Sequence, residues 1–280
     1  MCILFVYVNN SGKRVPGEYR LIVASNRDEY YARAAEAAAP WEDCDHVVIG
    51  GRDMEPGREG GTWLAAGCCE GTIRIGALLN VTGEDHSSNA VTGRGPIVSN
   101  YLRGKLSSED YSKQLLLTND AYRAFNFVSI ELERTGGAVV LHASNAPRRI
   151  DRCDLKGPLG FSNSTFEVPL EKVKNGRQRF GAIVDKRLKV ASRDSLVQNM
   201  LDMLRSNEKY FPDEELSRRA PAQAEHLASI NVRIPEAGYG TRTRTVILVD
   251  HENRMEFIEE TMVSSDPDGE WKRTELKREF

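Results

Sequence analysis

The chain has no apolar run long enough to cross a membrane. Its longest uninterrupted apolar stretches, such as residues 3–8, are far shorter than the roughly 20 residues that a membrane-spanning helix needs. This opening stretch has no basic residues before it and no small-residue cleavage site after it, which argues against a secretory signal peptide. We therefore expect a cytoplasmic protein without a transmembrane segment.

Cysteine is scarce, and its spacing suggests no pairing. The five cysteines are an odd number and include no C-x-x-C pair, which argues against a disulfide framework and against a cysteine-rich zinc site. Cys68 and Cys69 are neighbours, but neighbouring side chains of a strand point to opposite faces. We therefore predict no metal site, no catalytic cofactor and a reducing compartment.

Neither sign of charge dominates the chain. Lys and Arg number 38, Asp and Glu number 41, and the net charge is -3, so bulk charge gives no attraction to nucleic acid or to an anionic membrane. The 280 residues are 40% hydrophobic, which is enough for a sizeable core. We find no repeat or linker, and we predict one domain over residues 1–280 and no nucleic-acid partner.

What the sequence does contain is a series of short strand-like segments separated by Gly, Pro, Asn and Asp clusters. They are residues 2–8, 20–25, 47–50, 62–66, 72–79, 125–132, 138–143, 243–249, 254–261 and 271–280. A helix is expected at residues 108–118, and an amphipathic helical pattern occupies residues 170–206. Strands in both halves with helices between them predict an α+β fold with two antiparallel sheets.

Cys2 is the residue with the most specific chemistry. Removal of Met1, which is favoured when the next residue is small, would leave a thiol beside a free α-amine. The ordinary pKa of such an amine is about 7.7–8.0 and that of a thiol is about 8.5, so proton transfer between them costs little near neutral pH. Cys2 is therefore a candidate nucleophile that carries its own base. The alternative is a small buried residue that begins a strand.

Four polar residues follow the apolar segment 21–24. Asn26, Arg27, Asp28 and Glu29 come at the end of this segment, where a sheet delivers side chains to a site. An Arg near a thiol favours the thiolate, and a carboxylate near the α-amine would orient it. The alternative is an ordinary solvated turn.

Further polar groups stand at apparent strand ends farther along the chain. Asn80 and Asn163 each end an apolar run, where amide N–H donors can stabilise a developing oxyanion, although each also fits a turn. Arg242 and Arg244 precede an apolar segment and share one face if the strand alternates regularly. They can supply a second guanidinium near the thiol.

Five ordered motifs resemble those of one family. They are Met1-Cys2-Ile3, Asn26-Arg27-Asp28-Glu29, Gly60-Gly61-Thr62-Trp63-Leu64, Gly160-Phe161-Ser162-Asn163 and Gly238-Tyr239-Gly240-Thr241-Arg242-Thr243. They look like the NRDE family, that of transport and Golgi organization protein 2, and the resemblance covers nearly the whole chain. It implies a single NRDE domain with the four-layer αββα sandwich of N-terminal-nucleophile hydrolases. The cysteine members of those hydrolases include bile salt hydrolases, penicillin V acylases and acid ceramidase.

The wider resemblance to these hydrolases implies a set of catalytic residues. By this resemblance Cys2 is the nucleophile and Arg242 is the distal arginine. Asn80 and Asn163 are then the groups that stabilise the oxyanion and orient the amine.

The match is poorer at the first polar loop. The hydrolases place Arg and Asp three residues apart, whereas Arg27 and Asp28 are adjacent and would face opposite sides of a regular strand. A bulge can bring them together. Otherwise Asn26 and Asp28 face the site while Arg27 and Glu29 do other work.

The NRDE resemblance implies intracellular heme trafficking, with lipid or acyl-CoA homeostasis as a related theme and mitochondria or other organelles as places of action. The sequence has no C-x-x-C-H motif for covalent heme attachment and no Cys-Pro dipeptide, so heme as cargo would be held exchangeably. The candidate axial ligands are a cysteine, His46, His86, His142, His226 and His251.

An anionic amphipathic cargo needs both apolar and cationic contacts. We expect ligand contacts from Asn26, Glu29, Trp63 and Arg244, and Trp41 and Trp63 can line an apolar pocket or belong to the core. Eight Lys and Arg against two acidic residues give residues 171–193 a local charge of +6, which suits such a cargo or a transient membrane contact. The alternative is a solvated basic helix face.

Three functions are compatible with these residues. The leading one is an intracellular heme-handling protein. The second is an N-terminal-cysteine amidohydrolase, in which the Cys2 thiolate attacks the carbonyl of an N-acyl substrate. The third is a non-catalytic lipid or acyl-CoA binder. The sequence thus leaves open whether the chain is an enzyme, and it does not set the oligomeric state.

Overall fold

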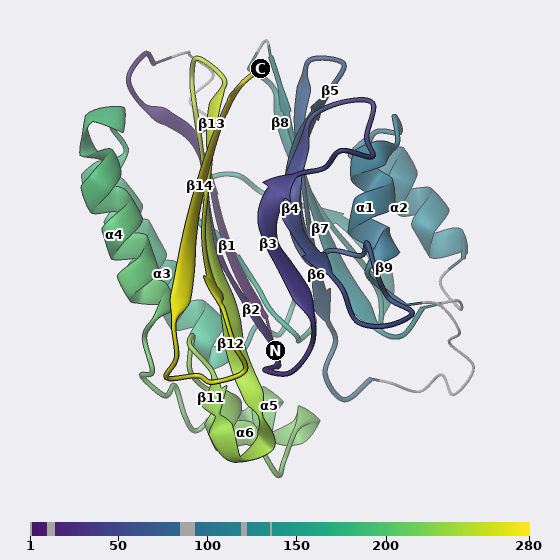
Figure 1. Cartoon of the computed structure of the whole chain (residues 1–280), viewed down its shortest axis with the longest axis vertical. Helices are drawn as coiled ribbons and strands as arrows, with labels where there is room; N and C mark the ends of the chain where they lie inside the picture. The colour runs from purple at the N-terminus through teal and green to yellow at the C-terminus, as the bar shows by residue number, and fades with distance from the viewer. Residues whose placement is uncertain (1, 10–14, 85–92, 119–121, 135) are drawn as a thin grey trace. The chain divides into compact units, whose positions relative to one another are not determined.

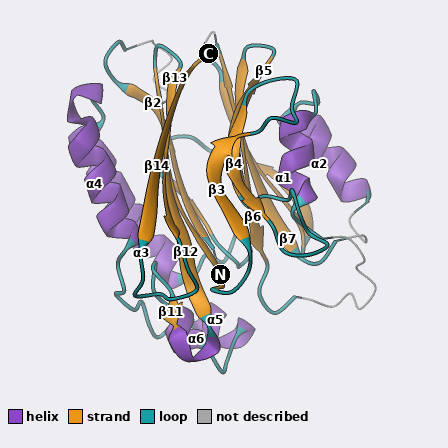
Figure 2. Ribbon diagram, viewed as in Figure 1, coloured by secondary structure: helices purple, strands orange, loops and turns teal. Residues whose placement is uncertain are grey.

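The computed structural model describes residues 2–9, 15–84, 93–118, 122–134 and 136–280, which form two compact units. One unit combines residues 1–32 with 154–280, and the other consists of residues 33–153. Each is built on one antiparallel sheet with helices packed against it (Figure 2). The predicted α+β fold with two antiparallel sheets is confirmed, and each unit contributes one sheet layer and one helical layer. The single domain stays a prediction.

In the sheet of the first unit, the N-terminal strand lies between the next strand of the chain and a strand from a distant part of it. Its order is β10 (Leu159–Phe161), β1 (Ile3–Val8), β2 (Tyr19–Tyr30), β12 (Tyr239–Asp250), β13 (Arg254–Met262) and β14 (Trp271–Glu279), and β11 (Arg233–Ile234) pairs with β12. The helices α3 (Glu171–Arg187) and α4 (Arg193–Leu204) run along this sheet, and α5 (Glu214–Arg219) and α6 (Ala224–Leu227) follow them (Figure 1).

The helical layer of this unit forms because α4 carries a continuous apolar stripe. The stripe consists of Leu196, Val197, Met200, Leu201 and Leu204, all of which are buried. It packs with Ile22 and Ala24 of β2 and with Val246 and Leu248 of β12 in one core cluster. Each fully buried side chain of this kind contributes roughly 1.5–3 kcal/mol. The amphipathic pattern predicted over residues 170–206 therefore corresponds to α3 and α4.

The second unit has the simpler topology, because each strand lies next to the strand that follows it in the chain. The order is β3 (Ala35–Pro40), β4 (Val48–Asp53), β5 (Leu64–Cys69), β6 (Thr72–Asn80), β7 (Phe125–Glu133), β8 (Ala138–Asn145) and β9 (Arg148–Arg152). The helix α1 (Pro96–Arg103) packs against it through Ile97, Val98 and Tyr101, and α2 (Ser108–Leu117) packs through Leu115 and Leu116. Ser107 caps α2 by accepting a hydrogen bond from Asp110 N at 3.1 Å.

Two strands are longer than predicted, and this matters for the site. β2 runs on through the polar residues 26–29, and β12 already begins at Tyr239. The alternative of a solvated turn at residues 26–29 is therefore wrong, because these residues pair with β12. The edge strands β3 and β9 were not predicted, since they are alanine-rich and highly charged, respectively. The edge strand β10 corresponds to the strand end predicted before Asn163.

No helix in the described part of the chain has both the length and the apolar character that a bilayer crossing requires.

Candidate functional site

The strands β2 and β12 carry most of the predicted polar residues. Asp28 pairs with Thr241 and Arg27 with Thr243, so Arg242 is an extra residue on β12 and forms a β-bulge. Because the extra residue lies on β12, β2 keeps its regular alternation. Arg27 and Asp28 therefore face opposite sides of the sheet, which is the second of the two arrangements predicted for them.

The bulge also changes what Arg242 and Arg244 contact. Arg244 donates from Nη2 to Asn231 Oδ1 at 3.1 Å, and its guanidinium lies 3.8 Å from the ring centroid of Trp271. Arg242 donates from Nη1 to the main-chain oxygen of Tyr30 at 3.3 Å. The predicted common face does not follow once the alternation is interrupted, and the two guanidinium groups contact different residues.

Cys2 lies just before β1 and is partly buried. Its main-chain N–H donates to Oδ1 of Asn163 at 2.5 Å, and its Sγ lies 3.9 Å from the main-chain oxygen of Asp28. Asn163 is buried in the segment that follows β10, the strand paired with β1. The structure thus brings together Cys2, Asp28 and Asn163, three of the six predicted catalytic residues.

The Cys2 thiol is held in its protonated form by its surroundings. Burial raises the pKa of this thiol above its ordinary value, because a thiolate loses solvation there, and the Asp28 carboxylate raises it further. Arg27 acts in the opposite direction. The predicted lowering of the thiol pKa by an arginine is present, but the effect of burial is larger.

Asp28 is a buried carboxylate with hydrogen bonds to both its side chain and its main chain. Its Oδ1 accepts from the Thr241 hydroxyl at 2.6 Å, and its main-chain oxygen accepts from the Tyr239 hydroxyl at 3.3 Å. Burial raises the pKa of the Asp28 carboxyl, while the positive charge of Lys172 and the Thr241 hydrogen bond oppose the rise. A buried carboxylate without such contacts would be strongly destabilising.

Lys172 is the site residue that the sequence analysis assigned to the surface. We expected it on a basic helix face, but it is fully buried, and its Nζ donates to the main-chain oxygen of Ser229 at 3.1 Å. The helical spacing in the sequence indicates this burial, because the buried residues Gly176 and Phe180 follow Lys172 at i+4 and i+8 on α3. The prediction of a continuous exposed basic face is therefore wrong at Lys172.

The buried charges of this site are coupled. Burial lowers the pKa of Lys172, and the negative charges of Asp28 and of an ionised Cys2 oppose the decrease. The ammonium of Lys172 therefore favours the ionised forms of Cys2, just before β1, and of Asp28, near the end of β2. Buried titratable groups with shifted pKa values gather at functional sites more often than elsewhere.

Asn26 has a structural role, and the ligand contact predicted for it stays a prediction. It is fully buried, and its Nδ2 donates to the main-chain oxygens of Leu204 at 2.8 Å and Ile230 at 3.0 Å. Both amide hydrogens therefore join β2 to the end of α4 and to the segment before β11. Glu29 is half-buried, and its Oε1 accepts from the main-chain N–H of Tyr30 at 3.0 Å.

Two predicted site residues belong to the second unit. Asn80 is the last residue of β6 and is exposed. Trp63 comes just before β5, and its ring packs on Gly51, where any side chain would overlap it. The roles predicted for Asn80 and Trp63 at the Cys2 site stay predictions.

Two of the candidate histidine ligands already have engaged rings. His46 Nε2 lies 2.6 Å from the main-chain oxygen of Leu102. His142 is buried, and its two ring nitrogens contact the side chains of Asn126 at 3.0 Å and Asp151 at 3.4 Å. Burial lowers the pKa of His142 to about 4. Iron binding would cost His142 one of these contacts, and it would cost His46 its contact if Nε2 were the ligand.

His226 and His251, the other described histidines, belong to no assembled metal site. His226 lies on α6, His251 is buried in the turn after β12, and His86 lies outside the described residues. Within the described ranges, no group of three or more His, Cys, Asp or Glu side chains is arranged to hold a metal ion.

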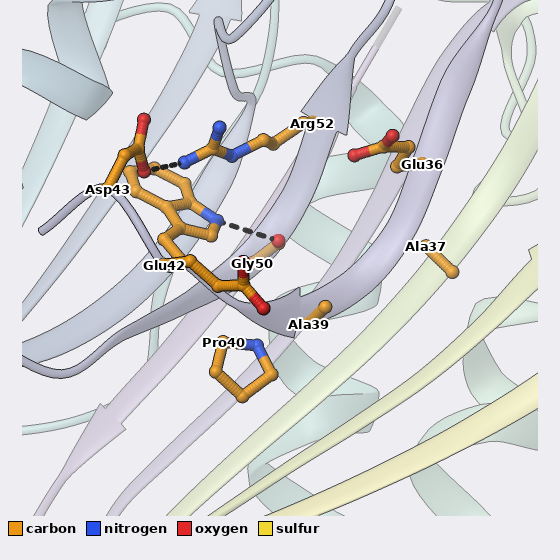
Figure 3. Close-up of a pocket in the computed structure, with 9 residues that line it drawn as sticks. Glu36, Ala37, Ala39, Pro40, Glu42, Asp43, Gly50 and Arg52 are labelled. Atoms are coloured by element: carbon orange, nitrogen blue, oxygen red, sulfur yellow. Dashed lines mark hydrogen bonds and ion pairs between the residues drawn. The ribbon is translucent and has the colours of Figure 1, made fainter.

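A pocket of about 380 Å³ lies along β3 and β4 of the second unit (Figure 3). Trp41 lines it beside several charged residues and also belongs to the core, which is the second of the two roles predicted for it, and its indole N–H donates to the main-chain oxygen of Gly50 at 3.0 Å. The Arg52 guanidinium lies 4.7 Å from the ring centroid, and Asp43 bonds both Arg52 and Arg103. The chain itself therefore supplies the cation over this aromatic ring.

Two solved structures resemble the chain at low sequence identity. Penicillin V acylase from Agrobacterium tumefaciens is 13% identical, with a TM-score of 0.49 over 94% of this chain and 84% of that one. A variant of conjugated bile acid hydrolase from Clostridium perfringens is 9% identical, with a TM-score of 0.49 over 100% of this chain and 97% of that one. Both belong to enzyme groups named above with the family resemblance.

The sequence relatives are much closer. The chain is 46% identical over 284 residues to Transport and Golgi organization protein 2 of Drosophila melanogaster, covering 100% of this chain and 99% of that protein. It is 35% identical to the homolog of Bos taurus and 32% identical to that of Homo sapiens, with 95% of both chains covered in each case. The model of the family described as Transport and Golgi organisation 2 matches residues 1–264. The family predicted from the five motifs is confirmed, and the chain belongs to the Transport and Golgi organisation 2 family.

Proposed function

We propose that the chain is an intracellular heme-handling protein that binds heme reversibly at Cys2. The observation that carries this proposal is the environment of the Cys2 thiol. Burial and Asp28 raise the pKa of this thiol, so iron must displace a proton to bind the sulfur. That requirement weakens the bond at neutral pH, and a carrier that must release its cargo needs a weak bond.

The charge around Cys2 also suits this cargo. Heme carries two carboxylates, and the same unit holds Arg27 on β2, Arg242 on β12 and Lys172 on α3. Arginine is well suited to carboxylates because its guanidinium can bind both oxygens at once. The five cysteines are all free thiols, which supports the proposed cytoplasmic location and leaves room for transient contact with mitochondria or other organelles.

A titration with hemin tests the proposal. We expect saturable binding by the full chain with a shifted Soret band, and transfer of the heme to an apo-acceptor such as apomyoglobin. Cys2→Ala is expected to lose the thiolate features of the spectrum and to weaken binding about tenfold or more.

Cys68→Ala is the matched control, because Cys68 is another partly buried free thiol, on β5 of the second unit. It is expected to bind hemin like the wild type. Absence of saturable binding in the wild type would reject heme handling, and an unchanged spectrum in Cys2→Ala would reject Cys2 as the ligand. Competition by palmitoyl-CoA without any hemin binding would favour the lipid-binding alternative.

One observation favours the amidohydrolase as a second candidate. Asn163 Oδ1 accepts from the main-chain nitrogen of Cys2, and that nitrogen becomes the α-amine if Met1 is removed. Asn163 would then hold the amine beside the thiol that it must deprotonate. Intact mass of the cellular protein checks for loss of Met1. Turnover of a panel of N-acyl amides by the wild type, abolished in Cys2→Ala, would support hydrolysis.

A further inference from the structure

Two tyrosines lie at the polar end of the β2–β12 pair, close to Asp28, and have no role in the chemistry proposed so far. Tyr239 opens β12, and its hydroxyl donates to the main-chain oxygen of Asp28 at 3.3 Å. The same oxygen lies 3.9 Å from Cys2 Sγ. Tyr30 ends β2 directly opposite Tyr239, and the two rings meet edge to face with centroids 5.4 Å apart. The thiol and both rings are thus linked through one carbonyl oxygen and one aromatic contact.

The backbone around Tyr239 is built to hold its ring in this place. Gly238 has a φ of 60°, in the left-handed region that favours glycine, and it ends the short 3₁₀ turn before β12. Gly240 leaves no room for a side chain, because a Cβ there would overlap the Tyr31 hydroxyl and the main-chain oxygen of Val232. The glycines on either side therefore fix the entry of β12, and Tyr239 is the side chain that this turn positions.

Tyr30 is exposed to an extent that the fold does not require. Its side chain is 60% exposed, although the ten residues before it in β2 are almost all buried. Its main-chain oxygen accepts from Arg242, so a buried cation lies at the same end of the two strands. Tyrosine combines a large apolar ring with a polar tip and is enriched at binding surfaces for that reason.

We propose that Tyr30 and Tyr239 form an aromatic rim beside Cys2 that binds the flat apolar body of the ligand. This inference deepens the proposed function and rests on it for the identity of the cargo, because a porphyrin is a flat apolar ring system. The geometry itself selects a chemical class: a planar, conjugated body whose reactive or coordinating atom reaches the sulfur. An aromatic rim of this kind gives affinity for the body while the thiol holds one atom of it.

The test compares two electrophiles that react with the same thiol. N-(1-pyrenyl)maleimide carries a flat aromatic body and N-methylmaleimide does not, and in both the sulfur adds to the carbon–carbon double bond while the thiol proton ends on the neighbouring carbon. The native full-length chain is labelled and then digested. Mass spectrometry of the peptides gives the labelling rate at Cys2 and, as an internal reference, at Cys68. We expect the pyrenyl to methyl rate ratio at Cys2 to exceed that at Cys68.

Substitutions in the rim separate stacking from other roles. Tyr30→Ala and Tyr239→Ala are each expected to lower the rate ratio at Cys2 by about twofold to tenfold, which is the range of a single aromatic contact. Tyr30→Phe and Tyr239→Phe keep the rings and are expected to keep the ratio. Phe211→Ala is the matched control, because Phe211 is also an exposed aromatic, in the loop between α4 and α5. Should Tyr239→Ala fail to fold, Tyr30→Ala still decides, since its ring is mostly in solvent.

A hemin titration of the same variants separates this inference from the proposed function. Weaker hemin binding and a lower rate ratio in the alanine variants support both. A lower ratio without any hemin binding in the wild type rejects heme as the cargo and keeps the rim. Hemin binding and a rate ratio that are both unchanged in Tyr30→Ala and Tyr239→Ala overturn the rim and leave the proposed function standing.

Discussion

The strands β2 and β12 pair along their whole length, but the two halves of this pair are stabilised in different ways. In the half formed by residues 21–24 and 246–249, every side chain is apolar and fully buried, and the register is uninterrupted. In the half formed by residues 26–30 and 239–244, nearly every side chain is polar, and the register shifts at Arg242. The apolar half stabilises the strand pair, and the polar half carries side chains of the candidate site.

The polar half is stable because other side chains donate hydrogen bonds or positive charge to its buried groups. The Asp28 carboxylate is tolerated since Thr241 donates to it and the ammonium of Lys172 lies nearby. Without such contacts, burial of a charge costs several kcal/mol. In this sheet the buried charges adjoin a regular hydrophobic half that holds the two strands together. The predictions below test this division from the largest expected effect to the smallest.

The largest effect is expected in the apolar half. Ile22→Ala removes a fully buried side chain that packs with Val246 and Leu248, and we expect it to lower the free energy of unfolding by about 3 kcal/mol. Urea denaturation measures this change. The maleimide rate ratio at Cys2 should not change, because Ile22 makes no contact that sets the site. A loss below about 1 kcal/mol would show that this half does not carry the stability.

A smaller loss of stability is expected from the polar half. Thr241→Val keeps the shape but removes the donor to Asp28 and the acceptor of Val232 N, and we expect a loss of about 2 kcal/mol. Thr243→Val is the comparison, because it breaks only a hydroxyl pair with Thr261 and should cost about 1 kcal/mol. Equal losses would mean that the buried carboxylate adds nothing to the value of the Thr241 hydrogen bond.

The two halves also differ in how far the sequence predicts them. The apolar half follows from composition, since runs such as Leu21-Ile22-Val23-Ala24 fit a strand buried on both faces. For the polar half and its surroundings, residue types and family motifs identified Cys2, Asp28 and Asn163, and the structure brings these three together.

Three features of the polar half and of the groups packed on it could not be predicted from the sequence. The shift at Arg242 depends on which residue of β2 each residue of β12 pairs with, and such long-range pairing has no local signal. Lys172 belongs to a run of basic residues, and only its helical spacing from buried residues indicates that its side chain is buried. The structural use of Asn26 depends on main-chain oxygens of Leu204 and Ile230, which are far away in the chain.

Removal of the buried carboxylate should activate the thiol. Asp28→Asn keeps an acceptor for Thr241 but removes the negative charge that raises the pKa of Cys2, so the pKa of the thiol should fall. We expect labelling of Cys2 by iodoacetamide at pH 7.5 to become roughly threefold to tenfold faster. A slower rate in this variant would mean that Asp28 does not act on the thiol through its charge.

Removal of the buried ammonium should have a smaller effect of the opposite sign. Lys172→Met takes away a positive charge that favours the ionised forms of Asp28 and Cys2, and we expect labelling of Cys2 to slow by about twofold to threefold. Lys174→Met is the matched control, because Lys174 lies on the same helix but is exposed and paired with Glu171. Equal effects of the two substitutions would place Lys172 outside the coupled group.

The central claim is that Cys2 is a ligand-binding thiol and not an activated nucleophile. The pH dependence of its labelling by iodoacetamide, read by mass spectrometry on the Cys2 peptide of the native protein, tests this claim most directly. We predict a midpoint above that of the same peptide in the unfolded chain, because burial and Asp28 both raise the pKa of the thiol. A midpoint below that of the unfolded chain would contradict this account and would favour a cysteine hydrolase.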